Sequence, residues 1–357
     1  MTGAALCAVL AVIVACWLVR DVRAVEIDHL WRYWAGWRDS GRTGVPTTSA
    51  SDVVLLVVYA ATAVAALSSA VAGSALVAAG VVTLAVRLPG VWTIGSTQME
   101  QAYSDELRSR ALICAFVALA AGIGLFVTAG AGRRPTFDTT EELPGKPGPG
   151  AAVTTFLLLG AAGAVLLAWE IRHVVVRPDL FPDWYVGGEG FGQALTDPPP
   201  GWAAVAPALL ALYIAGSALA PAVHTRPFGL MTAALLLVSG GLQLIWAVHE
   251  DVFDHFGSLG TENQLMVASW GFETFVALVV LLVLSPRGLP EVNSPYDPGT
   301  GYGTPGYDAP GYGYPPAGPS SYARDPGARP HTPGYGYPQG GGGFGPPPPP
   351  SQPPPGW

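Results

Sequence analysis

Charge is the scarcest property of this 357-residue chain, because only 12% of its residues are charged, against about 25% in soluble globular domains. The charged residues are absent from a series of apolar blocks and gather between them. Lysine is nearly lacking, since Lys146 is the only one, and no basic run suited to nucleic acid is present. These absences exclude a soluble globular protein and a nucleic-acid-binding protein, and they are typical of a chain that crosses a membrane several times.

Cysteine and recognisable catalytic motifs are also scarce. The three cysteines (Cys7, Cys16 and Cys114) lie in apolar segments without the spacing of a zinc site, so we interpret them as small apolar residues. The sequence has no Walker motif and no nucleophile elbow, and the glycine-rich string at 187–192 lacks the strand and helix of a phosphate site. We therefore assign no cofactor and no reaction. No internal repeat is convincing from the sequence.

The apolar blocks predict how often the chain crosses the bilayer. They cover residues 4–19, 52–86, 111–131, 151–169, 203–220, 228–248 and 265–284. Six blocks suit one helix each, but block 52–86 would make a helix of about 50 Å, against a hydrocarbon core of about 30 Å. Small and polar residues at 68–74 favour two helices joined by a turn, which gives eight spans. Seven spans with one overlong helix are the alternative.

Arginine and lysine in short loops indicate the orientation. Loop 132–150 contains three of these bases and is expected in the cytoplasm, whereas loop 249–264 contains four acids and neither base and is expected outside. Arg287 follows the last span, so the tail is also expected inside. Segment 20–51 contains five arginines and is therefore expected inside. Eight spans place this segment outside, whereas seven spans place it inside.

Tryptophans follow the first span at a regular interval. Trp31, Trp34 and Trp37 recur every three residues in segment 25–39 and have arginines beside them. On a helix they form an aromatic stripe with basic flanks, which predicts a helix lying in the headgroup plane.

The composition changes abruptly after residue 285. Segment 286–357 repeats Pro-Gly-Tyr and ends in runs of proline, which predicts a disordered tail with stretches of polyproline II. Such a tail is a solubilising tether, or it supports self-association or docking to a cytoplasmic protein. The tail resembles those of actinobacterial membrane proteins in composition, and the Ala, Gly, Val, Pro and Arg usage is typical of a GC-rich genome. This resemblance transfers no function.

Histidine and carboxylate side chains collect at the predicted outer ends of three spans. Glu170 and His173 share a helix face after the fifth span, because they are three residues apart. His249 and Glu250 end the seventh span, and Glu273 lies inside the eighth. These residue types are ligands for zinc or manganese. We regard the five as candidate metal ligands, with His173 and His249 as an alternative pair for haem. The alternative is that they form the polar ends of helices.

Glu273 is the sharpest of these candidates, because an ionised carboxylate within a span is costly and is a functional candidate by default. We expect it to be paired, with Arg172, His173 or Gln243 as its partner.

The sequence therefore predicts an all-α transmembrane bundle of eight, alternatively seven, helices with a disordered Pro/Gly/Tyr-rich tail. Its domains are a polytopic membrane domain at 1–285 and the tail at 286–357. We expect a multi-pass protein of a bacterial cell membrane, whose partners are the bilayer and, through the tail, cytoplasmic proteins or further copies. The favoured function is a scaffold. The alternatives are a small-solute or proton-coupled transporter and an outer-face metalloenzyme.

Overall fold

The computed structural model describes residues 1–37, 45–68, 72–131, 147–188, 193–220 and 222–285. Every regular element in these ranges is a helix, and eight of the helices are long and apolar enough to cross a membrane. The predicted tail at 286–357 lies outside the described residues. The compact unit Met1–Pro295 contains all of the described helices.

The eight spans confirm the favoured count over the seven-span alternative. They are α1 (Thr2–Val25), α3 (Ala50–Ser68), α4 (Gly73–Arg87), α7 (Asp105–Ala131), α8 (Pro149–Val176), α10 (Pro200–Leu219), α11 (Thr225–His249) and α12 (Thr261–Leu284). The apolar block 52–86 forms α3 and α4, which pack against each other. One helix over the whole block would be longer than the hydrocarbon core of a bilayer, whereas each of the two shorter helices fits within it.

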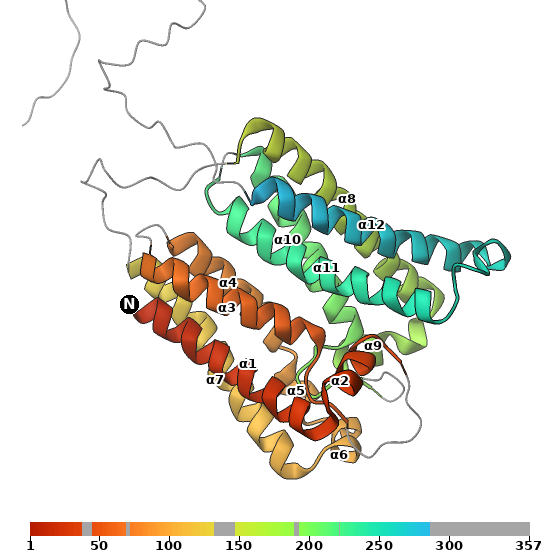
Figure 1. Ribbon diagram of the computed structural model, residues 1–357, viewed down its shortest axis with the longest axis horizontal. Coiled ribbons are helices and arrows are strands. Elements are labelled where there is room, and N and C mark those ends of the chain that lie inside the picture. Colours follow the sequence, from red (N-terminus) through yellow and green to blue (C-terminus); the bar gives the residue numbers. More distant parts are fainter. Residues whose placement is uncertain (38–44, 69–71, 132–146, 189–192, 221, 286–357) are drawn as a thin grey trace, which may run out of the picture. The chain divides into compact units, whose positions relative to one another are not determined.

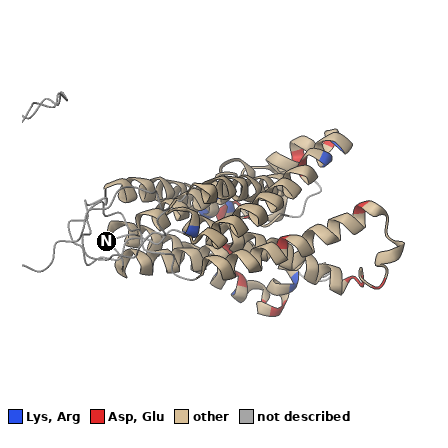
Figure 2. Ribbon diagram, turned by 90° about the horizontal axis from the view of Figure 1, so that it is seen from above, with Lys and Arg blue, Asp and Glu red and all other residues tan. Residues whose placement is uncertain are grey.

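Short helices lie between the spans at one face of the bundle. They are α2 (Ile27–Trp34), α6 (Thr97–Ala102), η1 (Pro178–Leu180), α9 (Phe181–Val186) and η2 (Phe256–Ser258). The short helix α5 (Gly90–Thr93) continues the third span, which runs from Gly73 to Thr93. We call this face, where α1, α4, α8 and α11 end, the loop face. Except for Arg226 and Glu273, the charged side chains of the described residues lie at it, and Figure 2 shows them away from the N-terminus.

The spans form two four-helix halves, which appear as separate groups in Figure 1. The first half contains α1, α3, α4 and α7, and the second contains α8, α10, α11 and α12. In each half the first helix packs on the second and the third on the fourth, while the first also meets the fourth and the second meets the third. The halves meet through α11, which packs on α3 and α4, and through α10, which packs on α4.

The two halves also share the order of their helices. Both halves place a short helix between their first two spans, α2 in one and η1 with α9 in the other. Identical residues stand at equal separations along the two copies of this region, namely Trp17 and Trp169, Arg20 and Arg172, Val22 and Val174, and Tyr33 and Tyr185. Further identities occur in the second spans at a separation two residues longer, namely Leu55 and Leu209, Leu56 and Leu210, and Tyr59 and Tyr213. The two halves thus share the order and packing of their helices, and the expectation about a sequence repeat stays a prediction.

The predicted aromatic helix is present but shorter than the segment 25–39. It begins after Glu26, whose φ of 61° ends the run of α1. Leu30 is buried, and the Trp34 indole donates to the Thr48 carbonyl at 2.8 Å. Trp31 is 40% exposed. This helix therefore packs partly on the protein, whereas the sequence predicted that it lies among the lipid headgroups.

Candidate functional site

Glu170 and His173 lie together at the end of α8, as their spacing predicts. Glu170 is 5% exposed and accepts hydrogen bonds from the Trp184 indole at 3.0 Å and the Tyr185 hydroxyl at 2.7 Å. Its carboxylate is 3.8 Å from His173 Nδ1. Burial, together with this carboxylate, raises the pKa of Tyr185 above its ordinary value, so the phenol stays protonated as a donor. Glu170 thus fastens α9 to the end of α8.

The other candidate ligands have different neighbours. The His249 ring stacks on Trp37 with 3.9 Å between centroids, and Glu250 is exposed. Glu273 is 8% exposed and accepts a hydrogen bond from the Ser239 hydroxyl. Within the described residues, no three His, Cys, Asp or Glu side chains form a group that could hold a metal ion.

The observed partner of Glu273 differs from the three residues that the sequence suggested. Arg172 pairs with Glu262 at 2.5 Å, and Gln243 is exposed. Ser239 on α11 is the partner instead, because the packing of α11 on α12 brings it beside Glu273. Glu273 lies roughly 18 Å from the start of α12 at 1.5 Å per residue, near the middle of the helix.

Asp21 forms a second buried carboxylate centre, which the sequence analysis did not select. Its side chain has no exposed surface and receives four hydrogen bonds of 2.7–2.8 Å from the amides and hydroxyls of Thr47 and Thr48. Arg20 pairs with it at 2.6 Å. Because charge-assisted hydrogen bonds are the stronger ones, Asp21 holds the connector that leads into α3 in one position.

A third centre joins the two halves at the loop face. Asp52 at the start of α3 pairs with Arg87 at the end of α4. Thr196, in the connector before α10, donates its hydroxyl to Asp52 at 2.9 Å and accepts from Arg87 at 2.9 Å through its carbonyl. The Thr196 amide and hydroxyl also contact the Thr47 carbonyl, each at 2.9 Å. We call Thr47, Asp52, Arg87, Thr196 and Asp197 the junction.

Asp197 is the titratable group of the junction that lies outside the spans. Desolvation raises its pKa from 3.8 to about 7, Ser49 and Arg87 oppose this increase, and the nearby Asp52 carboxylate adds to it. Arg87 therefore pairs directly with Asp52 and acts on Asp197 through its charge alone. Asp197 changes charge near neutral pH, unlike an ordinary aspartate.

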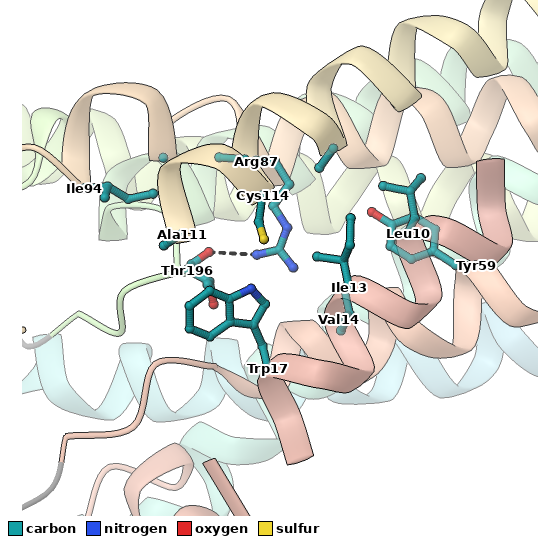
Figure 3. Close-up of a pocket in the computed structure, with 13 residues that line it drawn as sticks. Leu10, Ile13, Val14, Trp17, Tyr59, Arg87, Ile94, Ala111, Cys114 and Thr196 are labelled. Atoms are coloured by element: carbon teal, nitrogen blue, oxygen red, sulfur yellow. Dashed lines mark hydrogen bonds between the residues drawn. The ribbon is translucent and has the colours of Figure 1, made fainter. Parts of the chain in front are cut away.

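A small cavity lies beside the junction inside the first half. Figure 3 shows the Arg87 guanidinium pointing among Trp17, Cys114 and Thr196, with Tyr59 and Leu10 farther along the cavity. Its volume of about 30 Å³ accommodates water, which needs about 10–15 Å³ per molecule. The cavity is too small for a metabolite.

No protein-family model matches the chain, and neither a curated protein nor a solved structure matches it. The functional argument therefore rests on the residues and their geometry.

Proposed function

We propose that this protein is a proton-coupled transporter of a small solute, with Glu273 as the residue that carries the proton. The observation that supports this function is the position of Glu273, a buried carboxylate near the middle of a span whose described partner is a neutral hydroxyl. Intramembrane carboxylates of this kind mark proton or ion pathways. Among the residues that the structure describes, no basic side chain forms an ion pair with Glu273 to neutralise a permanent charge.

The two-half architecture supports the same function. Each half has an even number of spans, so both begin at the same face of the membrane. Parallel repeats related by an axis along the membrane normal occur in transporters, which work by moving one half against the other. The hydrogen bonds recorded between the two halves of the described chain lie at the loop face. Such an arrangement suits closure at that face.

The orientation belongs to this proposal. The loop face is outside and the tail is cytoplasmic, because the basic loop 132–150 and Arg226 belong to the opposite face. Acids such as Glu250, Asp251 and Asp254 belong to the loop face.

Uptake into proteoliposomes tests the transport function. Purified protein is offered labelled amino acids, sugars, organic acids and inorganic cations, with the loop-face compartment one pH unit more acidic. We expect one class of solute to accumulate only with the pH gradient, and Glu273→Gln to abolish that accumulation at unchanged abundance. Asp254→Asn, an exposed acid at the loop face, serves as the control. The proposal fails if no solute accumulates, or if Glu273→Gln transports as the wild type does.

A scaffold acting through the tail is the second candidate, supported by the repeated Pro-Gly-Tyr sequence at 286–357. Deletion of that segment separates the two functions. A scaffold loses its clustering in the membrane when the tail is removed, whereas a transporter keeps its uptake. We do not propose the metalloenzyme, because Glu170, His249 and Glu273 contact different partners.

A further inference from the structure

A second cavity lies at the loop face, between the end of α8 and the short helices η1 and α9. Its volume is about 120 Å³, which is room for several water molecules at about 10–15 Å³ each. One continuous stretch of chain forms its lining, namely His173, Val174, Arg177, Leu180, Phe181 and Trp184. The cavity therefore belongs to the second half alone and does not depend on the junction.

Two basic side chains line this cavity from one face of α8. His173 and Arg177 are four residues apart, and residues with this spacing share a helix face. Arg177 stands at the corner between α8 and η1, where its amide donates to the His173 carbonyl at 2.9 Å. Among the residues that the structure describes, none forms an ion pair or a hydrogen bond with the Arg177 guanidinium. Arg172, by contrast, is already paired with Glu262.

The contact between α8 and α9 holds the His173 ring in one orientation. Glu170 Oε2 accepts the hydrogen bonds of Trp184 and Tyr185, and Glu170 Oε1 lies 3.8 Å from His173 Nδ1. This Nδ1 is buried and has no hydrogen-bond partner in the described part of the chain. The Trp184 ring packs edge-on against the imidazole, with 5.1 Å between centroids. With Nδ1 turned to Glu170, Nε2 on the opposite side of the ring is the nitrogen left for a ligand.

The length of α8 places this cavity at the level of the lipid headgroups. Its 28 residues extend about 42 Å at 1.5 Å per residue, whereas the hydrocarbon core is about 30 Å thick and the bilayer with its headgroups about 40–45 Å. The last turn, with His173 and Arg177, therefore lies beyond the hydrocarbon. Leu180 and Phe181 follow at this end and are 40% and 45% exposed. Exposed apolar side chains beside two bases suit a lipid better than a soluble anion.

We propose that this cavity binds the phosphate of an anionic phospholipid from the leaflet at the loop face. The Arg177 guanidinium donates to two phosphate oxygens, because its planar fork matches phosphate geometry. The protonated Nε2 of His173 donates to a third oxygen. Val174, Leu180 and Phe181 contact the glycerol and the first carbons of the acyl chains. The bound lipid would stabilise the corner between α8 and α9, independently of any transport through Glu273.

The charges around the cavity favour an anionic lipid over a zwitterionic one. No acid of the described residues is part of its lining. The Glu170 carboxylate lies behind the His173 ring and is occupied by the two donors from α9. The ammonium group of a zwitterionic lipid would therefore find no carboxylate in the cavity, whereas Arg177 balances the single negative charge of phosphatidylglycerol.

Thermal unfolding of the delipidated full-length protein in a neutral detergent tests the site. Phosphatidylglycerol is added up to saturation, because a ligand that binds only the folded state raises the Tm. We expect a saturable rise for the wild type, and we expect Arg177→Gln to need at least tenfold more lipid for the same rise. Arg177→Lys should lie between them, because lysine keeps the charge but lacks the planar fork. Each shift is measured from the lipid-free Tm of the same variant, which separates lipid binding from a change in stability.

Arg110→Gln is the matched control. It removes one positive charge at the loop face from a side chain that is 66% exposed and lies on α7, away from the cavity. Its response to phosphatidylglycerol should equal that of the wild type. An equal loss of response in Arg110→Gln and Arg177→Gln would show a general effect of charge and overturn the proposal.

Native mass spectrometry counts the lipids that remain bound. The wild type should retain one more phosphatidylglycerol than Arg177→Gln does, and equal numbers would mean that only general lipid contacts exist. An equal Tm response to phosphatidylcholine would also overturn the proposal, because the charge of the lipid would then not matter. A Tm rise with inorganic phosphate but not with phosphatidylglycerol would assign the cavity to a free anion instead of a lipid.

Discussion

Asp21 is a single side chain that organises the start of the second span. The connector at 45–49 contains the donors that it needs, because the amides and hydroxyls of Thr47 and Thr48 all point to one carboxylate. Tyr103 adds a hydrogen bond to the Pro46 carbonyl at 2.7 Å. The connector thus has polar partners from two directions, which places Asp52 where it meets Arg87.

Replacement of Asp21 by alanine should destabilise the protein strongly. The change leaves four buried donors without their acceptor, and each buried donor left unsatisfied costs about 1–3 kcal/mol. Thermal unfolding in detergent should show a clearly lower Tm than for Asp254→Ala, whose site is exposed. Equal Tm values for the two variants would show that the connector is held by other contacts.

The partner of Glu273 shows what the sequence can and cannot supply at this scale. Hydropathy places Glu273 inside a span, because the length of the last apolar block is fixed by Ser285 and Arg287. Its partner depends on the register between α11 and α12, which places Ser239, one turn before Gln243 on the same face of α11, level with Glu273. The α12 sequence alone does not determine that register. Burial of Glu273 was predictable, and the contact with Ser239 was not.

Close approach of α8 and α10 depends on a single glycine. A Cβ at Gly163 would lie 2.9 Å from the Ala208 carbonyl oxygen and 2.8 Å from Leu212 Cγ. Three residues earlier on the same helix, a Cβ at Gly160 would meet only the Ala215 Cβ, at 3.6 Å. Small residues let helices pack closely in lipid, where no hydrophobic effect drives them together.

Alanine substitutions at these two glycines should therefore have opposite effects. Gly163→Ala forces the helices apart and should destabilise the fold by about 1–3 kcal/mol, the usual cost of overpacking. Gly160→Ala gains helix propensity, worth up to about 1 kcal/mol, and meets only ordinary contact. Thermal unfolding of both variants checks this difference. A lower Tm for Gly160→Ala than for Gly163→Ala would show that this interface is not the tight one.

The elements themselves were the most predictable part of the fold. Six apolar blocks form one span each and block 52–86 forms two, because a run of about 20 apolar residues is long enough to cross a bilayer as a helix. The connectors were less predictable, since their positions depend on residues far away in the chain. The Arg87 contact with Thr196 joins residues 109 positions apart. In the sequence, Arg87 and Asp52 are charged residues at the ends of an apolar block and have no special pattern. The junction becomes visible only in the structure, where α10 and α11 pack on the first half.

The two halves should assemble when they are made as separate chains. Cutting the chain between residues 140 and 141 leaves four spans in each fragment and preserves every described contact of the junction. The fragments should co-purify after co-expression, because one apolar core includes residues of both halves. Arg87→Ala in the first fragment should reduce the yield of the complex. Fragments that insert but do not associate would contradict the interface between α11 and the first half.

Eight spans also make a prediction about sidedness. A reporter inserted at Arg42, which lies outside the described residues, and another after residue 290 should lie on opposite sides of the membrane. Protease added to intact cells should spare the tail, and protease added to inverted vesicles should remove it. Reporters on the same side would mean that the arginines of segment 20–51 decide the topology.

The equal orientation of the two halves has an evolutionary consequence. A four-span polypeptide starts and ends on the same side of the membrane, so two copies can be fused head to tail without inverting either one. The ancestor of such a chain needs no dual topology, only a parallel homodimer with a twofold axis along the membrane normal. Fusion then frees the copies to diverge, as Asp21 in the first half and His173 in the second illustrate at matching positions. A residue in one half can then change while the equivalent residue in the other half stays the same.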